Sequence, residues 1–216
     1  MKQKLVLYLT LIVALLLIGQ TAVFGATLYD FESGTQGWTT SVWPGDHYMT
    51  AVAQSTPPQP AHGGTYSLKG TITILIAKKS GQALVDPVSP LDLTGQLLTA
   101  FAYAPTGMGG TLSAPNGFSL FVKTGAGWVW ADNGWNNIGP ANENTWMQLN
   151  LNMTGIANAN DVREIGVKFG AAGGMVGTLS GNVYVDDVQA IPEPARMLLL
   201  GSGLVGLFGF ATRKKS

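Results

Sequence analysis

The sequence predicts an all-β fold, an antiparallel β-sandwich, for its middle region, residues 26–190. Glycine and proline interrupt this region roughly every eight to fifteen residues, and no window sustains the apolar period of a helix. Several short segments instead alternate apolar and polar residues, as strands with one buried face do. About nine such strands favour two stacked sheets over a closed barrel.

Two segments show this alternation most clearly. In residues 117–124, Phe118, Leu120 and Val122 are expected on one face of a strand and the residues between them on the other. In residues 71–76 the even-numbered residues are apolar and are expected to face the core. The expected strands are residues 27–31, 49–54, 66–77, 97–103, 117–124, 128–131, 146–151, 164–169 and 183–189, with one helical turn at residues 158–162.

The N-terminal segment has the three parts of a secretory signal peptide. Lys2 and Lys4 precede an apolar run at residues 5–18, and small or polar residues follow as far as Gly25. We therefore expect residues 1–25 to form a signal helix that directs the chain to the Sec translocon and is cleaved near Gly25. An uncleaved membrane anchor is the alternative.

The C-terminal segment, residues 191–216, also has three parts. They are Pro192, Glu193 and Pro194, an apolar stretch at residues 197–212, and the basic residues Arg213, Lys214 and Lys215. The apolar stretch predicts a short hydrophobic helix, which falls slightly short of a bilayer core of about 30 Å. It can span a membrane if flanking arginines reach the headgroups, with the basic cluster on the cytoplasmic side.

This arrangement resembles the PEP-CTERM sorting signal. In that family an exosortase membrane protease recognises the tail, and the carrier protein reaches the cell surface or the exopolysaccharide layer of a Gram-negative bacterium. The resemblance implies an intermediate anchored in the inner membrane, then a place on the cell surface or in the extracellular matrix. An ordinary tail anchor and a glycine-rich helix that packs against a partner are the alternatives.

The charge of the middle region differs from that of the whole chain. Six of the 12 Lys and Arg residues and eleven of the 12 Asp and Glu residues lie in residues 26–190, which therefore carry a net charge of about −5. An acidic surface argues against nucleic acid as a partner and favours cations or neutral ligands. The chain has no cysteine, so an exported domain must be held by its core or by a metal.

Three segments of the middle region look like the opening, second and closing strands of galactose-binding-like jelly rolls. They are Tyr-Asp-Phe-Glu at residues 29–32 followed by Gly37 and Trp38, Gly-Gly-Thr-Tyr-Ser-Leu-Lys at residues 63–69, and Val-Tyr-Val-Asp-Asp-Val at residues 183–188. Many non-catalytic carbohydrate-binding modules of glycoside hydrolases, including mannanases, share this outline. The resemblance implies a jelly-roll sandwich that binds carbohydrate.

Carboxylates are expected to gather where the first and last strands meet. Asp30 and Glu32 lie on the first expected strand, and Asp186 and Asp187 on the last. Carboxylates brought together repel one another, and a hard cation that takes six to eight oxygen ligands is their natural partner. The resemblance implies a structural calcium ion with Glu32 and Asp186 as its main ligands, and Asp30 is a further candidate. The alternative is that these residues end strands in water.

Tryptophans concentrate around a loop rich in glycine and asparagine. Trp128, Trp130 and Trp135 can stack on the apolar face of a sugar ring, while polar neighbours bind its hydroxyl groups. The candidate polar partners are Lys123, Asp132 and Asn133. The alternative is that some indoles fill the core, as we expect of Trp38 and Trp146.

Two histidine-containing loops complete the candidates. The loop at residues 43–48 places Asp46 and His47 together and is expected to border the tryptophan site. His62 has no carboxylate near it in the sequence and is expected to be solvated.

The sequence does not indicate an enzyme. It has no phosphate loop, nucleophile elbow or zinc-protease helix. The candidate acids Asp132, Glu143, Asp161 and Glu164 show no pairing typical of glycosidases. We predict a non-catalytic carbohydrate-binding protein of the cell surface or exopolysaccharide. The alternatives are a structural matrix protein without a sugar site and, as a minor one, a polysaccharide hydrolase.

Overall fold

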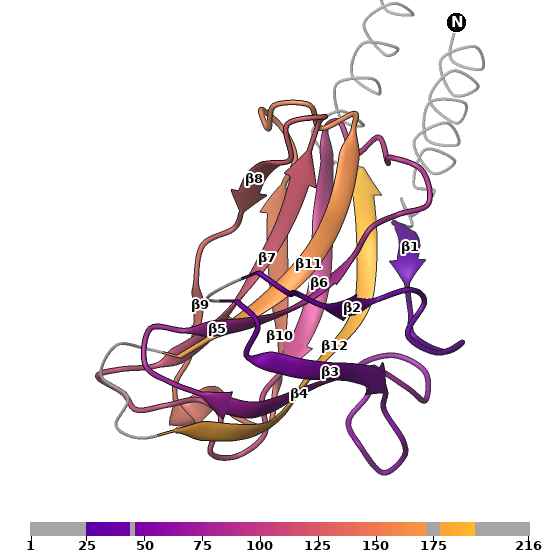
Figure 1. Ribbon diagram of the computed structural model, residues 1–216. Helices are drawn as coiled ribbons and strands as arrows, with labels where there is room; N and C mark the ends of the chain where they lie inside the picture. Colours follow the sequence, from indigo (N-terminus) through magenta and orange to yellow (C-terminus); the bar gives the residue numbers. More distant parts are fainter. Residues whose placement is uncertain (1–24, 44–45, 172–177, 193–216) are drawn as a thin grey trace, which may run out of the picture. The chain divides into compact units, whose positions relative to one another are not determined.

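Two antiparallel β-sheets face each other in the computed structural model, which describes residues 25–43, 46–171 and 178–192 (Figure 1). The predicted all-β sandwich is confirmed. Residues 26–191 form one compact unit. The predicted signal helix and C-terminal helix, with Glu193, Pro194 and the terminal basic cluster, lie outside the described residues. Within the described ranges, none of the helices has the length and apolar character needed to span a membrane.

Each sheet has six strands. Sheet A has the order β10-β6-β12-β4-β3, with β1 also beside β12. Its strands are β1 (Ala26–Tyr29), β3 (Met49–Gln54), β4 (Leu68–Leu75), β6 (Gln96–Tyr103), β10 (Trp146–Asn152) and β12 (Leu179–Pro192). Sheet B has the order β2-β5-β11-β7-β8, with β9 also beside β7. Its strands are β2 (Thr39–Thr40), β5 (Ser80–Val85), β7 (Asn116–Thr124), β8 (Val129–Asp132), β9 (Asn136–Ile138) and β11 (Val162–Gly170).

All nine expected strands are present within a few residues, and three further strands were not predicted. β2 and β9 have only two and three residues. β5 is buried along its whole length, so its sequence shows no alternation. The predicted helical turn at residues 158–162 is wrong, because Asn158 adopts a left-handed conformation with φ of 55° within a turn. The one 3-10 helix among the described residues lies at Pro140–Asn142.

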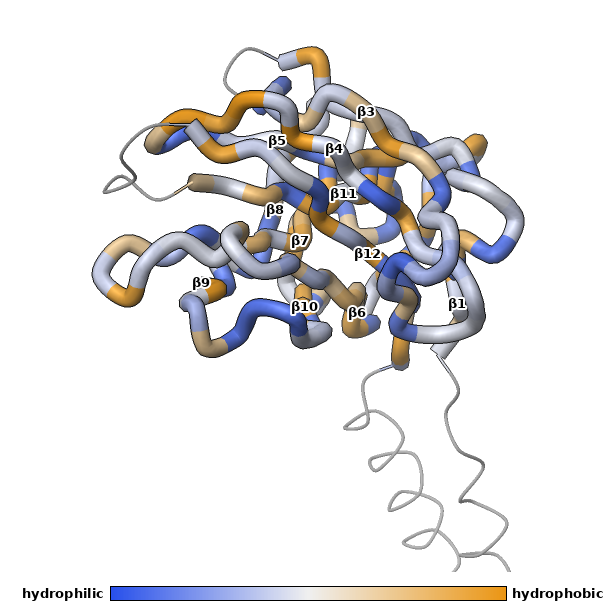
Figure 2. Tube along the Cα trace, turned by 90° about the horizontal axis from the view of Figure 1, so that it is seen from below, coloured by the Kyte–Doolittle hydropathy of each residue, from blue (hydrophilic) through white to orange (hydrophobic). Residues whose placement is uncertain are grey.

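The core lies between the inner faces of the two sheets. The predicted alternation of β7 is confirmed, since Phe118, Leu120 and Val122 are all buried. On the neighbouring strand β11, Val167 and Phe169 are buried in the same cluster. Figure 2 shows apolar residues in orange along β7, β11 and β12. Each large apolar side chain that is fully buried contributes about 1.5–3 kcal/mol, so this core can hold the fold without disulfides.

The predicted alternation at residues 71–76 is only partly right. Ile72 is buried as expected, but Ile74 is 55% exposed, and Leu75 is buried in its place. Between Ile72 and Leu75, three steps along β4 oppose two steps along β12. Such a bulge adds one residue to a strand and reverses which residues face the core.

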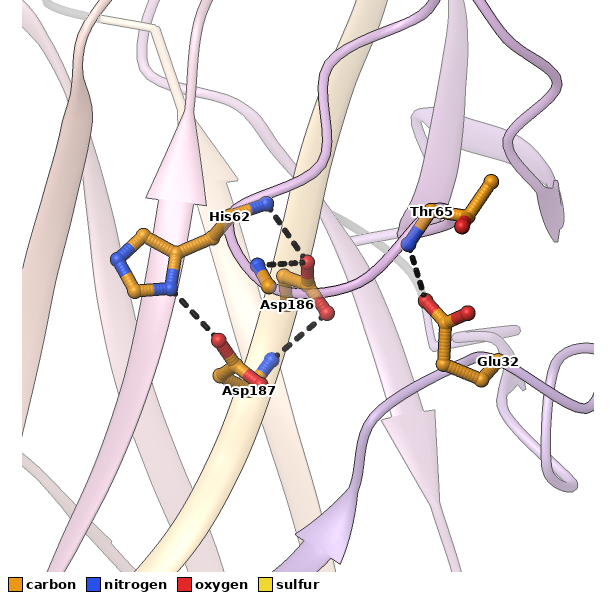
Figure 3. Close-up of polar contacts among 6 residues, drawn as sticks. Glu32, His62, Thr65, Asp186 and Asp187 are labelled. Atoms are coloured by element: carbon orange, nitrogen blue, oxygen red, sulfur yellow. Dashed lines mark hydrogen bonds and ion pairs between the residues drawn. The ribbon is translucent and has the colours of Figure 1, made fainter.

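Asp186 on β12 holds the loop that precedes β4 (Figure 3). Its Oδ2 atom accepts hydrogen bonds from the backbone N–H groups of His62 at 2.8 Å and Gly63 at 3.2 Å, and its Oδ1 atom accepts one from the N–H of Asp187 at 2.9 Å. The side chain is fully buried. Burial raises the pKa of Asp186 to about 6, while the three N–H groups act to lower it.

Glu32 holds the other end of the same loop. Its Oε1 atom accepts hydrogen bonds from the backbone N–H groups of Thr65 and Tyr66, both at 2.8 Å. Since β1 pairs with β12, the expected meeting of the first and last strands is confirmed. Carboxylates from both ends of the domain therefore fix one loop.

His62 is exposed to solvent, as expected, but the expectation that no carboxylate lies near it is wrong. Its Nδ1 atom lies 2.6 Å from Oδ2 of Asp187, and its ring stacks on Phe101 with centroids 3.5 Å apart. The two partners of this hydrogen bond are 125 residues apart in the sequence, so no local pattern could reveal the contact.

Replacing Asp186 with alanine is expected to lower the free energy of unfolding by about 2 kcal/mol or more, because three N–H groups lose their acceptor. Denaturant unfolding measures this. Asp161→Ala is the control, since it breaks only a partly exposed ion pair with Arg163 and should cost less than about 1 kcal/mol. Equal losses in the two variants would contradict the bracing role of Asp186.

The pH dependence of stability follows from the raised pKa of Asp186. At pH values between the ordinary pKa of an aspartate, 3.8, and about 6, the Asp186 carboxyl holds its proton in the folded protein more readily than in the unfolded chain. The contribution of Asp186 to the free energy of unfolding is therefore full at low pH and is lost as the pH rises through about 6. Melting temperatures of the wild type minus those of Asp186→Asn should decrease between pH 4 and pH 7, roughly the window that the two pKa values span. A difference that stays constant or increases over this range would refute the assignment.

Candidate functional site

Four exposed tryptophans gather on the outer face of sheet B. The exposed fractions are 64% for Trp43, 45% for Trp128, 38% for Trp130 and 52% for Trp135. Trp38, by contrast, is buried as expected, whereas Trp146, which was also expected in the core, is only half-buried. We refer to the four exposed tryptophans, together with Lys123 and Lys168, as the aromatic face.

The register of the strands explains why these side chains share one face. Lys123 on β7 lies opposite Trp130 on β8, and cross-strand partners point to the same side of a sheet. Lys168 on β11 alternates with the buried Val167 and Phe169, so it also points away from the core. The short spacing between Trp128 and Trp130 predicts that these two residues lie close together, but it does not predict that β11 contributes to the same surface.

Trp130 rests on a second aromatic ring. It stacks on Phe121 with centroids 4.1 Å apart and an interplanar angle of 16°. Its Nε1 atom donates a hydrogen bond of 2.7 Å to Oδ2 of Asp132. Phe121 in turn lies against the bare backbone of Gly166, where a Cβ atom would come within 2.3 Å of the ring. The position of the Trp130 ring is therefore fixed by Phe121 on one face and by Asp132 at its N–H group.

Trp135 lies against a glycine in the same way. A Cβ atom on Gly170 would lie 2.3 Å from Cη2 of the indole, closer than any real contact. Every second residue of β11 faces outward. Gly166 and Gly170 lie where an aromatic ring packs on the strand, and the other outward residues, Glu164 and Lys168, are charged. This lets Trp135 lie close to the sheet while remaining half exposed.

Two lysines lie among the indoles. Nζ of Lys168 is 5.6 Å from the ring centroid of Trp130 and 5.7 Å from that of Trp135. Nζ of Lys123 lies 5.9 Å from the rings of Trp43 and Trp128 and 6.0 Å from Trp130. These distances are in the range of cation–π contacts. Lys123, which was predicted, and Lys168, which was not, together link all four indoles.

Each of these lysines is also held by a carboxylate. Lys123 pairs with Glu164 at 2.7 Å, and Lys168 pairs with Asp46 at 2.8 Å. Burial raises the pKa of Glu164, and the Lys123 ammonium opposes that rise. Asp46 comes from the loop at residues 43–48, which was expected to border this site.

The remaining predicted residues support the tryptophan loop. Asp132 uses its second oxygen to accept the N–H of Gly134 at 2.9 Å, and Oδ1 of Asn133 accepts the N–H of Leu120 at 2.9 Å. Trp128 has a φ of 51°, an uncommon conformation for a bulky residue, at the turn that enters β8. Asp132 and Asn133 therefore fix the geometry of the loop.

Sequence reasoning missed several residues of this surface. Lys168 and the ring support from Phe121 were not predicted, Glu164 was not assigned to the site, and Trp43 was expected only as part of the loop that borders it. The available signal was the sequence of β11, where charged residues and glycines occupy the outward positions between buried ones.

The predicted calcium ligands do not gather into one cluster. Glu32 and Asp186 hold the same loop, but Oδ1 of Asp30 accepts a hydrogen bond of 2.7 Å from Gln36. Across the described ranges, no three His, Cys, Asp or Glu side chains are placed to hold a metal ion. Backbone N–H groups already donate to Oε1 of Glu32 and to both carboxylate oxygens of Asp186.

The candidate acids of a hydrolase are engaged in separate places. Glu143 accepts the N–H groups of Gly107 and Gly109 at 3.0 and 2.7 Å, and Asp161 pairs with Arg163. Asp132 and Glu164 lie beside the aromatic face, where Asp132 accepts a hydrogen bond from Trp130 and Glu164 pairs with Lys123. Each of the four therefore has a structural partner.

Solved structures share this fold at low sequence identity. One is CBM27-1 of Caldicellulosiruptor saccharolyticus in complex with mannohexaose, with a TM-score of 0.58, 18% identity, and coverage of 80% of this chain and 99% of that one. Another is CBM28, a carbohydrate-binding module specific for non-crystalline cellulose, with a TM-score of 0.52, 19% identity, and coverage of 78% and 95%.

A third solved structure is described as giving the structural basis for the promiscuous specificity of carbohydrate-binding modules of the β-sandwich superfamily. It has a TM-score of 0.56 and 20% identity and covers 79% of this chain. The present chain spans only 63% of that one. These structures establish the jelly-roll sandwich that was predicted.

Comparison with family profiles gives a match over residues 29–187, nearly all of the sandwich. No curated protein matches the sequence. The matched region begins at the end of β1 and ends on β12, so it contains both sheets, the aromatic face and the loop held by Asp186. The chain therefore belongs to the family of mannanase galactose-binding-like domains.

Proposed function

We propose that this chain is an exported, non-catalytic carbohydrate-binding protein that uses the aromatic face to bind polysaccharide. The observation that carries the proposal is the set of exposed indoles held in fixed positions by a glycine, by Phe121 and by two lysines. Rigid aromatic surfaces that remain half exposed are suited to stacking on sugar rings.

The chemistry of the face supports a sugar better than an apolar protein partner. Indoles offer flat apolar surface, while Lys123, Lys168 and Asp46 offer polar groups between and beside them. A sugar ring has the same combination of apolar face and hydroxyl rim. The alternative of a matrix protein without a sugar site would call for an extended apolar patch in place of this mixture.

The family and the fold neighbours point to the same class of ligand. CBM27-1 was solved with mannohexaose and CBM28 is specific for non-crystalline cellulose, so both are modules for polysaccharide. These two ligands are the natural starting points for testing the present chain.

The proposal includes a route to the cell surface. The signal peptide at residues 1–25 and the PEP-CTERM-like segment at residues 191–216 support export by the Sec translocon and sorting by an exosortase-type protease. The final location would be the cell surface or extracellular matrix of a Gram-negative bacterium, where a carbohydrate-binding domain meets polysaccharide.

Trp130→Ala and Trp135→Ala should each weaken polysaccharide binding about tenfold, which corresponds to the loss of about 1.4 kcal/mol of stacking. Isothermal titration of mannohexaose and of soluble cellulose oligosaccharides into the full-length protein, in a detergent without a sugar head group, measures this. Ile74→Ala is the matched control, because Ile74 is 55% exposed on sheet A.

The control variant should bind as the wild type does, and all variants should melt within a few degrees of it. Unchanged affinity in both tryptophan variants, or an equal loss in Ile74→Ala, would show that the aromatic face is not the site. A wild type that binds no glycan would favour the matrix-protein alternative.

Calcium binding at Glu32 and Asp186 stays a prediction. A bound cation would neutralise the buried carboxylate of Asp186 and replace its N–H partners. Replacing EGTA with calcium should then raise the melting temperature, and more at pH 7 than at pH 5, where a carboxyl with a pKa of about 6 is largely protonated. An unchanged melting temperature at both pH values would leave the hydrogen bonds as the only bracing of this loop.

A further inference from the structure

A pocket of about 490 Å³ lies at the Trp135 end of the aromatic face. Trp135 and Lys168 belong to both, so the pocket continues the surface proposed to bind polysaccharide. Its remaining wall comes from the turn between β4 and β5, which carries Lys78 and Lys79, from Asp46 and β9, and from the ends of β5, β7 and β11. We call it the lysine pocket.

The lysine pocket has a positive charge that the rest of the domain lacks. Residues 26–190 contain only six Lys and Arg residues, and four of them belong to the aromatic face or this pocket. Lys168 is neutralised by Asp46, whose carboxylate also accepts a hydrogen bond from Ser80. Lys78 and Lys79 have no ion-pair partner among the described residues, so the pocket carries about two unpaired positive charges.

The turn that carries these two lysines is held in an unusual conformation. Lys78 has a φ of 62°, in the left-handed region that glycine and asparagine favour. Backbone hydrogen bonds fix it to the end of β11, from the N–H of Lys78 to the carbonyl of Ala171 at 3.1 Å and from the N–H of Ala171 to the carbonyl of Lys79 at 2.9 Å. A long charged side chain at a position that suits glycine suggests that the ammonium group has a role.

We propose that the lysine pocket binds an anionic group carried by a sugar ring that stacks on Trp135, so that the ligand of this chain is an acidic polysaccharide. The inference rests on the proposed function and specifies its ligand class. Two lysines in water attract either a carboxylate or a sulfate, and the shared chemistry is a fixed negative charge beside a stacked ring.

This inference runs against the charge of the whole domain. A net charge of about −5 repels acidic polymers at long range, but salt at 0.15 M screens exposed charges beyond about 8 Å. Within that distance the charges of the pocket decide the interaction, and their sum is positive because one carboxylate, Asp46, faces three lysines. The acidic domain would then attract an acidic glycan at this end of its surface.

The test compares three oligosaccharides of equal length on the full-length protein, in a detergent without a sugar head group. They are mannohexaose, hexamannuronate, which has the same backbone with a carboxylate on each ring, and sulfated mannohexaose. The wild type should bind at least one acidic oligosaccharide about tenfold more tightly than mannohexaose at low salt, and 0.5 M NaCl should remove this advantage.

The double variant Lys78→Gln/Lys79→Gln should lose the preference while binding mannohexaose as the wild type does. Lys69→Gln, which removes a positive charge on β4 in sheet A, should keep the preference. Tight binding of hexamannuronate alone would identify a carboxylate, and tight binding of the sulfated form alone a sulfate.

The outcomes separate the two proposals. If mannohexaose binds and neither acidic form binds more tightly, the acidic ligand is excluded and the sugar-binding function stands. If the double variant keeps the preference, the lysine pocket is not its source and the inference fails. If no oligosaccharide binds at all, the proposed function and this inference fail together.

Discussion

The contact between aromatic rings and the glycine backbone of β11 is the constraint on which the proposed site depends. Phe121 lies on Gly166, and the indole of Trp135 lies on Gly170, in each case where a Cβ atom would overlap the ring. Any larger residue at either position would lift a ring away from the sheet. Because these rings are held close to the backbone, Trp130 stacks on Phe121, and the ammonium group of Lys168 lies near the rings of both Trp130 and Trp135. The geometry of the aromatic face thus follows from two small residues in a strand.

A second set of contacts fixes the opposite sheet without disulfides. Glu32 and Asp186 come from the two ends of the sandwich and hold one loop by its backbone N–H groups, and the ion pair of His62 with Asp187 adds to them. These charged groups have partners at short distance, which is the condition under which burying them is tolerated. The lysine pocket differs, since Lys78 and Lys79 have no such partner among the described residues.

The sequence predicted the sandwich well because strand alternation and turn residues are local signals, whereas much of the site depends on distant contacts. Trp128, Trp130 and Trp135 are close in sequence, so their neighbourhood could be predicted. Lys168 joins them only through the pairing of β11 with β7, which spacing does not reveal. His62 was misjudged because its partner is 125 residues away. The charge of the whole domain, likewise, gave no sign that its few cations gather at one end of the aromatic face.

The most direct test of the central claim is a titration of the six indole N–H signals by NMR, with mannohexaose or hexamannuronate as the ligand. The four tryptophans of the aromatic face are exposed, while Trp38 is buried and Trp146 lies on sheet A. If polysaccharide binds to the aromatic face, the signals of the four exposed indoles shift together and the other two do not. Saturable binding that shifts the signal of Trp146 alone, or none of the six, would contradict the account.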